Sequence, residues 1–282
     1  MVSGRAENMI QLIDVSKEYK MADSCRVALQ HINLTISEGE YIGILGLNQS
    51  GKSTLARLLN GLLKPTTGQV LINGMATDSP QEIRQIRQLL GMVFQNPDNQ
   101  LICPVVEEEI AFGPENLGLP PEEVNKRVDW ALELVGMQEM RYHAPHLLSG
   151  GQKQKVALAS VLAMQPRYLV LDEPTSMLDP LSRREILEHL CRINQENHIT
   201  IILISHHPED LLDAKRLILL HEGSIYMQGT PKEVFKDMEK LKAIGLKRPG
   251  LYQLIQQVEE EGYRIDDNIK TIPQLVEMIC RI

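Results

Sequence analysis

The chain has 282 residues, 43% of them hydrophobic, and a formal net charge of −8. This length allows a full α/β core with one or two subdomains, and the acidic balance argues against broad nucleic-acid binding. The first eight residues do not form a signal-peptide pattern, the apolar runs are too short to cross a bilayer, and the four scattered cysteines fit reduced thiols better than disulfides or a zinc site.

The first third of the chain predicts strands followed by a phosphate-binding loop. Apolar and polar residues alternate around residues 10–15 and 32–36, which indicates antiparallel strands. The buried-strand pattern Tyr41–Leu45 then leads into G-x-x-x-x-G-K-S at residues 46–53 and a helix-like run at residues 54–60. In that strand–loop–helix context the pattern predicts that backbone N–H groups and the lysine bind phosphates, while the serine hydroxyl binds Mg²⁺.

The middle of the chain predicts helices. After a short strand at residues 68–74, Ser79-Pro-Gln-Glu82 predicts a capped helix start. Residues 96–165 show helical periodicity and no convincing strand. Ser149 and Gln152 form a capping-box pattern, whose structural interpretation is a helix start. The two glycines between them also suit close approach of an anion to the backbone.

Strands return after residue 165. Tyr168–Leu171 and Ile199–Ile204 are continuous apolar runs separated by a helical pattern from Pro180 to Gln195, which predicts a parallel sheet covered on both faces. Asp172 and Glu173 end the first of these strands, so they are expected at the sheet edge that carries the phosphate loop. There an aspartate can hold a metal and a glutamate can orient or deprotonate water. An acidic pair that caps the next helix is the structural alternative.

The end of the chain predicts a hairpin around Gly223 and then a helical tail. Thr230-Pro-Lys-Glu233 is a second capping box, and it opens a helical segment that is expected to continue to Ile282. This tail holds as many basic as acidic residues, which argues against a polybasic membrane anchor.

Together these motifs resemble an ATP-binding cassette of the ABC transporter superfamily, over nearly the whole chain to about Gly229. The resemblance implies an α/β P-loop NTPase fold, with a RecA-like parallel-sheet core, an antiparallel β subdomain, a helical insertion and a small helical tail. It divides the chain into residues 1–95 (first part of the core with Walker A), 96–165 (helical subdomain with the signature motif), 166–230 (second part of the core with Walker B) and 231–282 (tail).

The resemblance also implies the ligands, ATP and Mg²⁺, and the residues that meet them. Tyr19 stands where the family stacks an aromatic ring on adenine. By this resemblance, Ser53, Gln95 and Asp172 would bind Mg²⁺. Glu173, His206 and Gln95 would take part in hydrolysis. The other implied nucleotide-binding residues are Gly46, Asn48, Gln49, Ser50, Gly51, Lys52, Ser53 and Thr54 of Walker A, Ser149, Gly150, Gly151 and Gln152 of the signature, and Asp179 of the D-loop.

Two positions depart from the family pattern. Gln49 stands where a third loop glycine is usual, and its side chain either points outward or tightens the loop. His207 follows His206 where an aspartate is common, which leaves two candidates for the switch histidine. The position directly after the preceding strand favours His206.

Three segments narrow the resemblance to the A component of bacterial energy-coupling factor (ECF) transporters: residues 93–100, 113–118 and 175–180. This resemblance implies import of vitamins or transition-metal ions. The implied partners are a second ATPase subunit, favouring a paralogous heterodimer, with a transmembrane T component and a substrate-binding S component. The chain would then lie at the cytoplasmic face of the cell membrane, held only through these proteins. Two alternatives stay open: the ATPase of another importer, for metal ions or amino acids, and a nucleotide-binding module in which hydrolysis is silenced.

Overall fold

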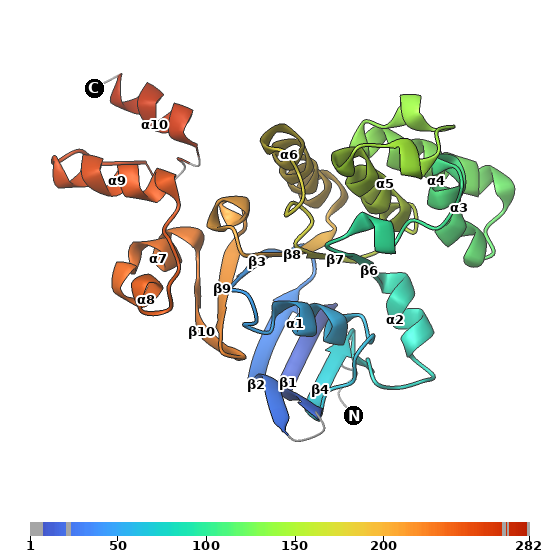
Figure 1. The fold of residues 1–282 in the computed structure, drawn as a ribbon, viewed down its shortest axis with the longest axis horizontal. Helices are drawn as coiled ribbons and strands as arrows, with labels where there is room; N and C mark the ends of the chain where they lie inside the picture. The colour runs from blue at the N-terminus through green and yellow to red at the C-terminus, as the bar shows by residue number, and fades with distance from the viewer. Residues whose placement is uncertain (1–7, 21–23, 267–268, 270, 281–282) are drawn as a thin grey trace, which may run out of the picture.

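The computed structural model describes residues 8–20, 24–266, 269 and 271–280 (Figure 1). It contains a four-stranded sheet of order β2-β1-β4-β5 and a six-stranded sheet of order β10-β9-β3-β8-β7-β6. The strands are β1 (Met9–Lys20), β2 (Cys25–Ser37), β3 (Tyr41–Leu45), β4 (Thr67–Ile72), β5 (Met75–Ala76), β6 (Leu90–Val93), β7 (Tyr168–Asp172), β8 (Thr200–Ser205), β9 (Arg216–His221) and β10 (Ser224–Gly229). The α-helices are α1 (Lys52–Leu59), α2 (Ile83–Leu89), α3 (Val106–Asn116), α4 (Pro121–Val135), α5 (Gly150–Leu162), α6 (Pro180–Asn197), α7 (Pro231–Lys236), α8 (Met238–Ala243), α9 (Gly250–Glu260) and α10 (Ile272–Ile279). Four 3₁₀ turns complete the described elements: η1 (Pro97–Asn99), η2 (Gln138–Met140), η3 (Pro145–Leu147) and η4 (Pro208–Leu211).

The six-stranded sheet is parallel except for its edge strand β10, which pairs antiparallel with β9. Its central strands β3, β7 and β8 are buried along their whole length, because both faces of the sheet are covered. Successive side chains alternate between the faces. In β7, for example, Tyr168 and Val170 pack on one face and Leu169 and Leu171 on the other.

Each face of this sheet has a different covering layer. One face packs on α1 and on the antiparallel sheet of β1, β2, β4 and β5, and together these elements form one continuous apolar core. The other face packs on α6 and on the helical group α3, α4 and α5, which lies to one side of the molecule in Figure 1. The loops that leave the carboxyl ends of β3, β6, β7 and β8 therefore share one edge between the two layers.

Most elements agree with the predictions from the sequence. The antiparallel strands, the hairpin around Gly223, the helix that begins at Pro180 and the strand-free segment 96–165 are all present. The capping boxes at Ser149 and Thr230 are also confirmed, each with its reciprocal side-chain and backbone hydrogen bonds. The last described helix ends at Ile279. Residues 281–282 of the expected tail and residues 1–7, for which no signal peptide was expected, lie outside the described residues.

The helix start predicted at Ser79 is wrong. Helix α2 begins four residues later, at Ile83, and has no side-chain cap. The Ser79 hydroxyl donates instead to Gln81, and the Glu82 carboxylate accepts from the backbone N–H of Ala76. The two capping partners are thus engaged in a turn after β5, which delays the helix.

The tail helices α9 and α10 form a small separate apolar cluster around Leu251, Ile255 and Leu275, at the far end of the molecule from α3–α5 (Figure 1). Within the described part of the chain, no helix combines the length and the apolar character that a membrane span requires.

Candidate functional site

A cavity of about 510 Å³ lies over the loop that joins β3 to α1. This volume is in the usual range for a small-molecule site. The end of strand β1, the strand β2 and the loops after β6 and β7 complete its wall. Its lining residues are Tyr19, Lys20, Arg26, Ala28, Asn48, Gln49, Gly51, Lys52, Ser53, Thr54, Gln95 and Glu173.

The loop at the base of the cavity depends on two unusual backbone positions. Gly51 has a φ of 104°, and a Cβ atom there would lie 2.5 Å from the carbonyl oxygen of Ala28, so only glycine fits. Gln49 also adopts a left-handed conformation, with a φ of 69°. Its exposed side chain accepts a hydrogen bond of 3.1 Å from Arg26, and both residues line the cavity.

Lys52 is a buried cation directed into this loop. Its ammonium group donates to the carbonyl oxygens of Gly46 and Leu47, at 2.8 and 2.9 Å. It also lies 3.6 Å from Glu173 Oε1. Burial lowers the pKa of Lys52, and the nearby Glu173 carboxylate opposes that shift. A buried cation with spare hydrogen-bonding capacity beside an open cavity is suited to an anion.

Ser53 and Asp172 meet at the first turn of α1. The Ser53 hydroxyl donates to Asp172 Oδ1 at 3.1 Å. Burial raises the pKa of the Asp172 carboxyl group, and the hydrogen bond from Ser53 works in the opposite direction. A hydroxyl and a carboxylate in contact are oxygen ligands of the kind that Mg²⁺ prefers.

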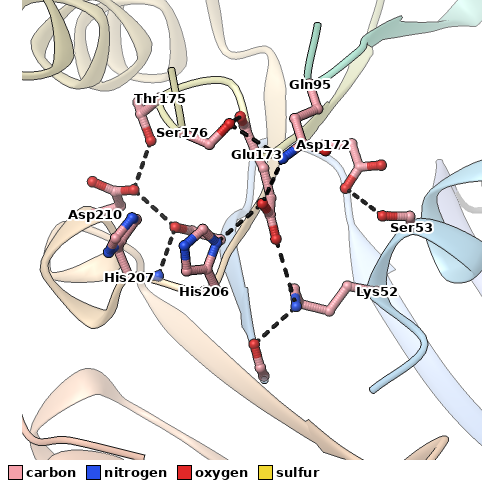
Figure 2. Close-up of polar contacts among 12 residues, drawn as sticks. Lys52, Ser53, Gln95, Asp172, Glu173, Thr175, Ser176, His206, His207 and Asp210 are labelled. Carbon is pink, nitrogen blue, oxygen red and sulfur yellow. Dashed lines mark hydrogen bonds and ion pairs between the residues drawn. The ribbon is translucent and has the colours of Figure 1, made fainter. Parts of the chain in front are cut away.

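Glu173 is the centre of the polar network at the cavity (Figure 2). Its Oε2 atom accepts a hydrogen bond of 3.0 Å from Gln95 Nε2 and lies 3.0 Å from His206 Nδ1. The second pair of atoms is close but lacks the alignment of a hydrogen bond. The backbone of Glu173 is left-handed, with a φ of 51°. Such positions are strained, and they concentrate at functional sites.

Of the two adjacent histidines, His206 is the one that reaches Glu173 (Figure 2). His207 stacks against it, with ring centroids 4.0 Å apart. The backbone N–H of His207 donates to the hydroxyl of Ser205. Burial and the nearby Arg183 lower the pKa of the His207 imidazole. The strand end thus directs His206, and not His207, toward Glu173.

The signature residues lie outside this cavity. Ser149 and Gly150 are exposed at the start of α5, and Asp179 caps α6 by accepting from the backbone N–H groups of Leu181 and Ser182. Within this one chain they do not meet Lys52 or Glu173.

The paired glycines at the start of α5 have different surroundings. A Cβ atom on Gly151 would lie 2.7 Å from the hydroxyl of Ser182, so this glycine permits close packing of α5 on α6. A Cβ atom on Gly150 would meet nothing nearer than the carbonyl of Met177 at 3.9 Å. Packing within the chain therefore accounts for Gly151 but not for Gly150.

Three residues of the cavity wall, Lys20, Arg26 and Ala28, were not predicted from the sequence. Of the residues predicted in Walker A, Gly46 and Ser50 do not line the cavity. The basic residue directly after Tyr19 and the arginine in the next strand were the available signal. Tyr19 itself lines the cavity, and its hydroxyl lies 3.3 Å from that of Thr54. Tyr19 therefore lies at the cavity wall in contact with the first turn of α1.

Comparison with known proteins places this geometry in a family. The family model described as ABC transporter matches residues 29–176. The chain belongs to the ABC transporter family. This cassette is 52% identical to the energy-coupling factor transporter ATP-binding protein EcfA1 of Caldanaerobacter subterraneus subsp. tengcongensis, with 90% of this chain and 91% of the relative covered. It is 46% identical to the protein of the same name from Clostridium novyi, with 98% and 99% covered.

Two solved structures extend the comparison. CbiO1 from Clostridium perfringens, part of the ABC transporter complex CbiONQ, has a TM-score of 0.75 and 38% identity, and covers 89% of this chain and 99% of its own. The cassette MJ0796, in a dimeric post-hydrolysis state bound to ADP and phosphate, has a TM-score of 0.73 and 32% identity, and covers 79% of this chain and 98% of its own. The predicted P-loop NTPase fold and the resemblance to ECF ATPase subunits are confirmed. The cassette is an ATP-binding ATPase of the energy-coupling factor type.

Proposed function

We propose that the cavity over the β3–α1 loop is the ATP site and that Tyr19 forms its adenine wall. The buried Lys52 and the loop N–H groups face the phosphates, and Asn48, Gln49, Ser50 and Thr54 shape the loop around them. The cavity supports this assignment because an aromatic ring, Tyr19, and an unusually buried cation, Lys52, both line it.

We propose that Mg²⁺ binds beside the phosphates, on Ser53, Asp172 and Gln95. The donor set fits the ion: a hydroxyl and a carboxylate already 3.1 Å apart, and an amide whose two hydrogen bonds, to Glu173 and Ser176, use only its nitrogen. The Gln95 oxygen is then left for the cation. When bound, the metal neutralises charge on the phosphates.

We propose that Glu173 is the hydrolytic carboxylate. It orients the attacking water and accepts its proton, while Gln95 and His206 fix the carboxylate from two sides. Lys52 contributes positive charge on the third side, at 3.6 Å. The convergence of these three side chains on one carboxylate at the cavity wall is the observation on which this assignment rests.

We propose that the second half of each ATP site comes from a facing cassette. Ser149, Gly150, Gly151 and Gln152 would meet the terminal phosphate held by the partner's loop, and Asp179 would sense that contact. The exposure of Ser149, Gly150 and Asp179, and the separation of all five residues from the chain's own cavity, support this arrangement. The exposed Gly150 N–H and the start of α5 suit an anion.

We further propose that the cassette pairs with a paralogous ATPase and drives a T component and an S component at the cytoplasmic face of the membrane. Membrane contact would come through these proteins alone, and the cargo would be a vitamin or a transition-metal ion. The names of the relatives support the importer class. We also propose the division of the chain into four parts. Residues 1–95 carry Walker A, residues 96–165 the signature motif, residues 166–230 Walker B, and residues 231–282 form the tail.

The test of the proposed function is Glu173→Gln in the cassette assembled with its partners. The amide keeps the shape of the side chain but cannot accept the proton. Turnover should therefore fall about a hundredfold or more, while ATP affinity, measured with a fluorescent ATP analogue, is retained. Glu188→Gln, an exposed carboxylate change on α6, is the matched control. Normal ATPase rates in the Glu173 variant would remove this residue from its role.

A further inference from the structure

Outside the residues assigned above, the described chain holds a buried carboxylate directly behind the site. Asp210 lies in η4, and its side chain is fully buried (Figure 2). Its Oδ2 atom accepts hydrogen bonds from the hydroxyls of Thr175 and Ser205, at 2.7 and 2.8 Å. Its Oδ1 atom accepts from Arg183 Nε at 2.6 Å. A buried anion with partners on both oxygens is held in one position.

The three partners of Asp210 belong to three segments that each lead to a proposed functional residue. Thr175 lies two residues after Glu173 in the loop that leaves β7. Ser205 ends β8 and directly precedes His206. Arg183 lies in the first turn of α6, which Asp179 caps. One carboxylate thus joins the Walker B loop, the switch-histidine strand and the helix that follows the D-loop.

A second contact extends the network toward the histidines. The Ser205 hydroxyl donates to Asp210 and accepts from the backbone N–H of His207. Because His207 stacks on His206, the path of the chain at both histidines depends on the orientation of Ser205. That orientation is set by Asp210.

We propose that Asp210 is a positioning residue for ATP hydrolysis, which holds His206 and the Glu173 loop in register and ties both to the first turn of α6. This proposal rests on the roles assigned to Glu173 and His206. A displacement of about 1 Å at a reacting group is enough to cost on the order of a hundredfold in rate. Thr175 lies two residues from Glu173, and Ser205 lies directly before His206. A change at Asp210 can therefore alter turnover without any contact with ATP.

The first test is Asp210→Asn in the assembled transporter. The amide cannot serve both hydroxyl donors and the Arg183 guanidinium, so we expect kcat to fall about tenfold to a hundredfold. ATP affinity should stay within about twofold, because Lys52 and its loop are untouched. A variant with wild-type kcat, or one whose loss lies in ATP affinity, would overturn the proposal. A lower Tm with unchanged kcat would assign Asp210 a purely structural role and would overturn it as well.

Arg183→Gln provides a second route if Asp210→Asn fails to fold, because Arg183 is partly exposed. It should lower kcat in the same direction, and Arg183→Lys, which keeps the charge, should restore part of it. Arg184→Gln is the matched control: this neighbouring arginine pairs with Glu188 at the surface, so kcat should not change. An equal loss in the Arg184 variant would contradict the specific role of the Asp210 pair.

A double-mutant comparison decides whether Asp210 acts through His206. In a His206→Ala background, Asp210→Asn should cause a much smaller further loss of residual turnover than it causes in the wild type. A full additional loss would show that Asp210 acts independently of His206 and would overturn that part of the proposal. The failure of the proposed function is separately visible, since it would appear as an active Glu173→Gln variant.

Discussion

Glu173 combines a left-handed backbone with three side-chain contacts. A carboxylate could be placed at this sheet edge from the sequence, because it ends a buried strand. Its backbone conformation could not, because non-glycine residues rarely adopt it. The turn at Glu173 directs the carboxylate back toward Lys52 and away from the next helix. This direction excludes the helix-capping alternative that the sequence alone left open for the acidic pair.

Asp172 gives a stability prediction with a defined pH dependence. Burial raises its pKa above the ordinary value of 3.8, so the folded state binds this proton more tightly than the unfolded state. The charged carboxylate therefore costs stability at neutral pH, and the cost disappears as the pH falls below the ordinary value. Asp172→Asn removes the charge and keeps an oxygen that can accept the bond from Ser53.

We therefore expect nucleotide-free Asp172→Asn to melt at a higher temperature than the wild type at neutral pH, by roughly 2–4 °C for each kcal/mol regained. The difference should shrink as the pH approaches 4. Thermal unfolding of both proteins across this pH range checks the prediction. An equal or lower Tm of the variant at neutral pH would contradict it.

Gln49 is a non-glycine residue at a loop position where the family usually has glycine. The usual glycine at this position suits a φ of 69°, which most residues avoid. Gln49 adopts this conformation, and its side chain accepts a hydrogen bond from Arg26 in β2. Compared with the usual glycine, the chain gains a side-chain contact and accepts local strain.

At the scale of elements, the close contact between α5 and α6 at Ser182 requires a glycine at position 151. Gly151→Ala should force α5 away from Ser182, since its Cβ would lie 2.7 Å from the hydroxyl. Overpacking of this kind costs about 1–3 kcal/mol, against about 1 kcal/mol gained in helix propensity. We expect a lower Tm for Gly151→Ala and an unchanged or higher Tm for Gly150→Ala, which has open space.

Thermal unfolding of the two alanine variants makes this comparison within one sequence motif. Gly151→Ala combined with Ser182→Gly should regain the lost stability, because the clash is then removed. Equal melting temperatures for the two single variants would refute the packing explanation of Gly151.

The sequence predicted the elements best where one periodicity covered a whole strand or helix. The apolar runs of β7 and β8 and the capping box at Ser149 depend on local chemistry, and they were recovered. The helix start at Ser79 was not, because Glu82 was taken by the backbone of Ala76 across a turn. The wall residues Lys20 and Arg26 were missed for a related reason, since their place depends on how β1 and β2 lie over the loop.

At the scale of the whole molecule, the Ser149 region and the cavity are on separate parts of one chain. Ser149→Arg should therefore leave ATP binding to the single cassette intact and block closure of the nucleotide-driven dimer. Analytical ultracentrifugation of the Glu173→Gln protein, with ATP and Mg²⁺, measures this. The added charge has a matched control in Gln138→Arg, an exposed position in the same helical group. Normal dimerisation of the Ser149 variant would contradict the shared-site arrangement.

The separation of Ser149 from Glu173 also determines how two defects combine. In the dimer that we propose, a chain that lacks the Glu173 carboxylate would share one pocket with the Ser149 region of a partner blocked at Ser149. Both lesions would then fall on that pocket, and the other pocket would be assembled entirely from intact parts. If each chain carries both lesions, neither pocket is spared. A dimer of two singly mutated chains would thus keep one intact pocket. The number of inactive pockets would depend on which lesion each chain carries, and not only on the number of mutated chains.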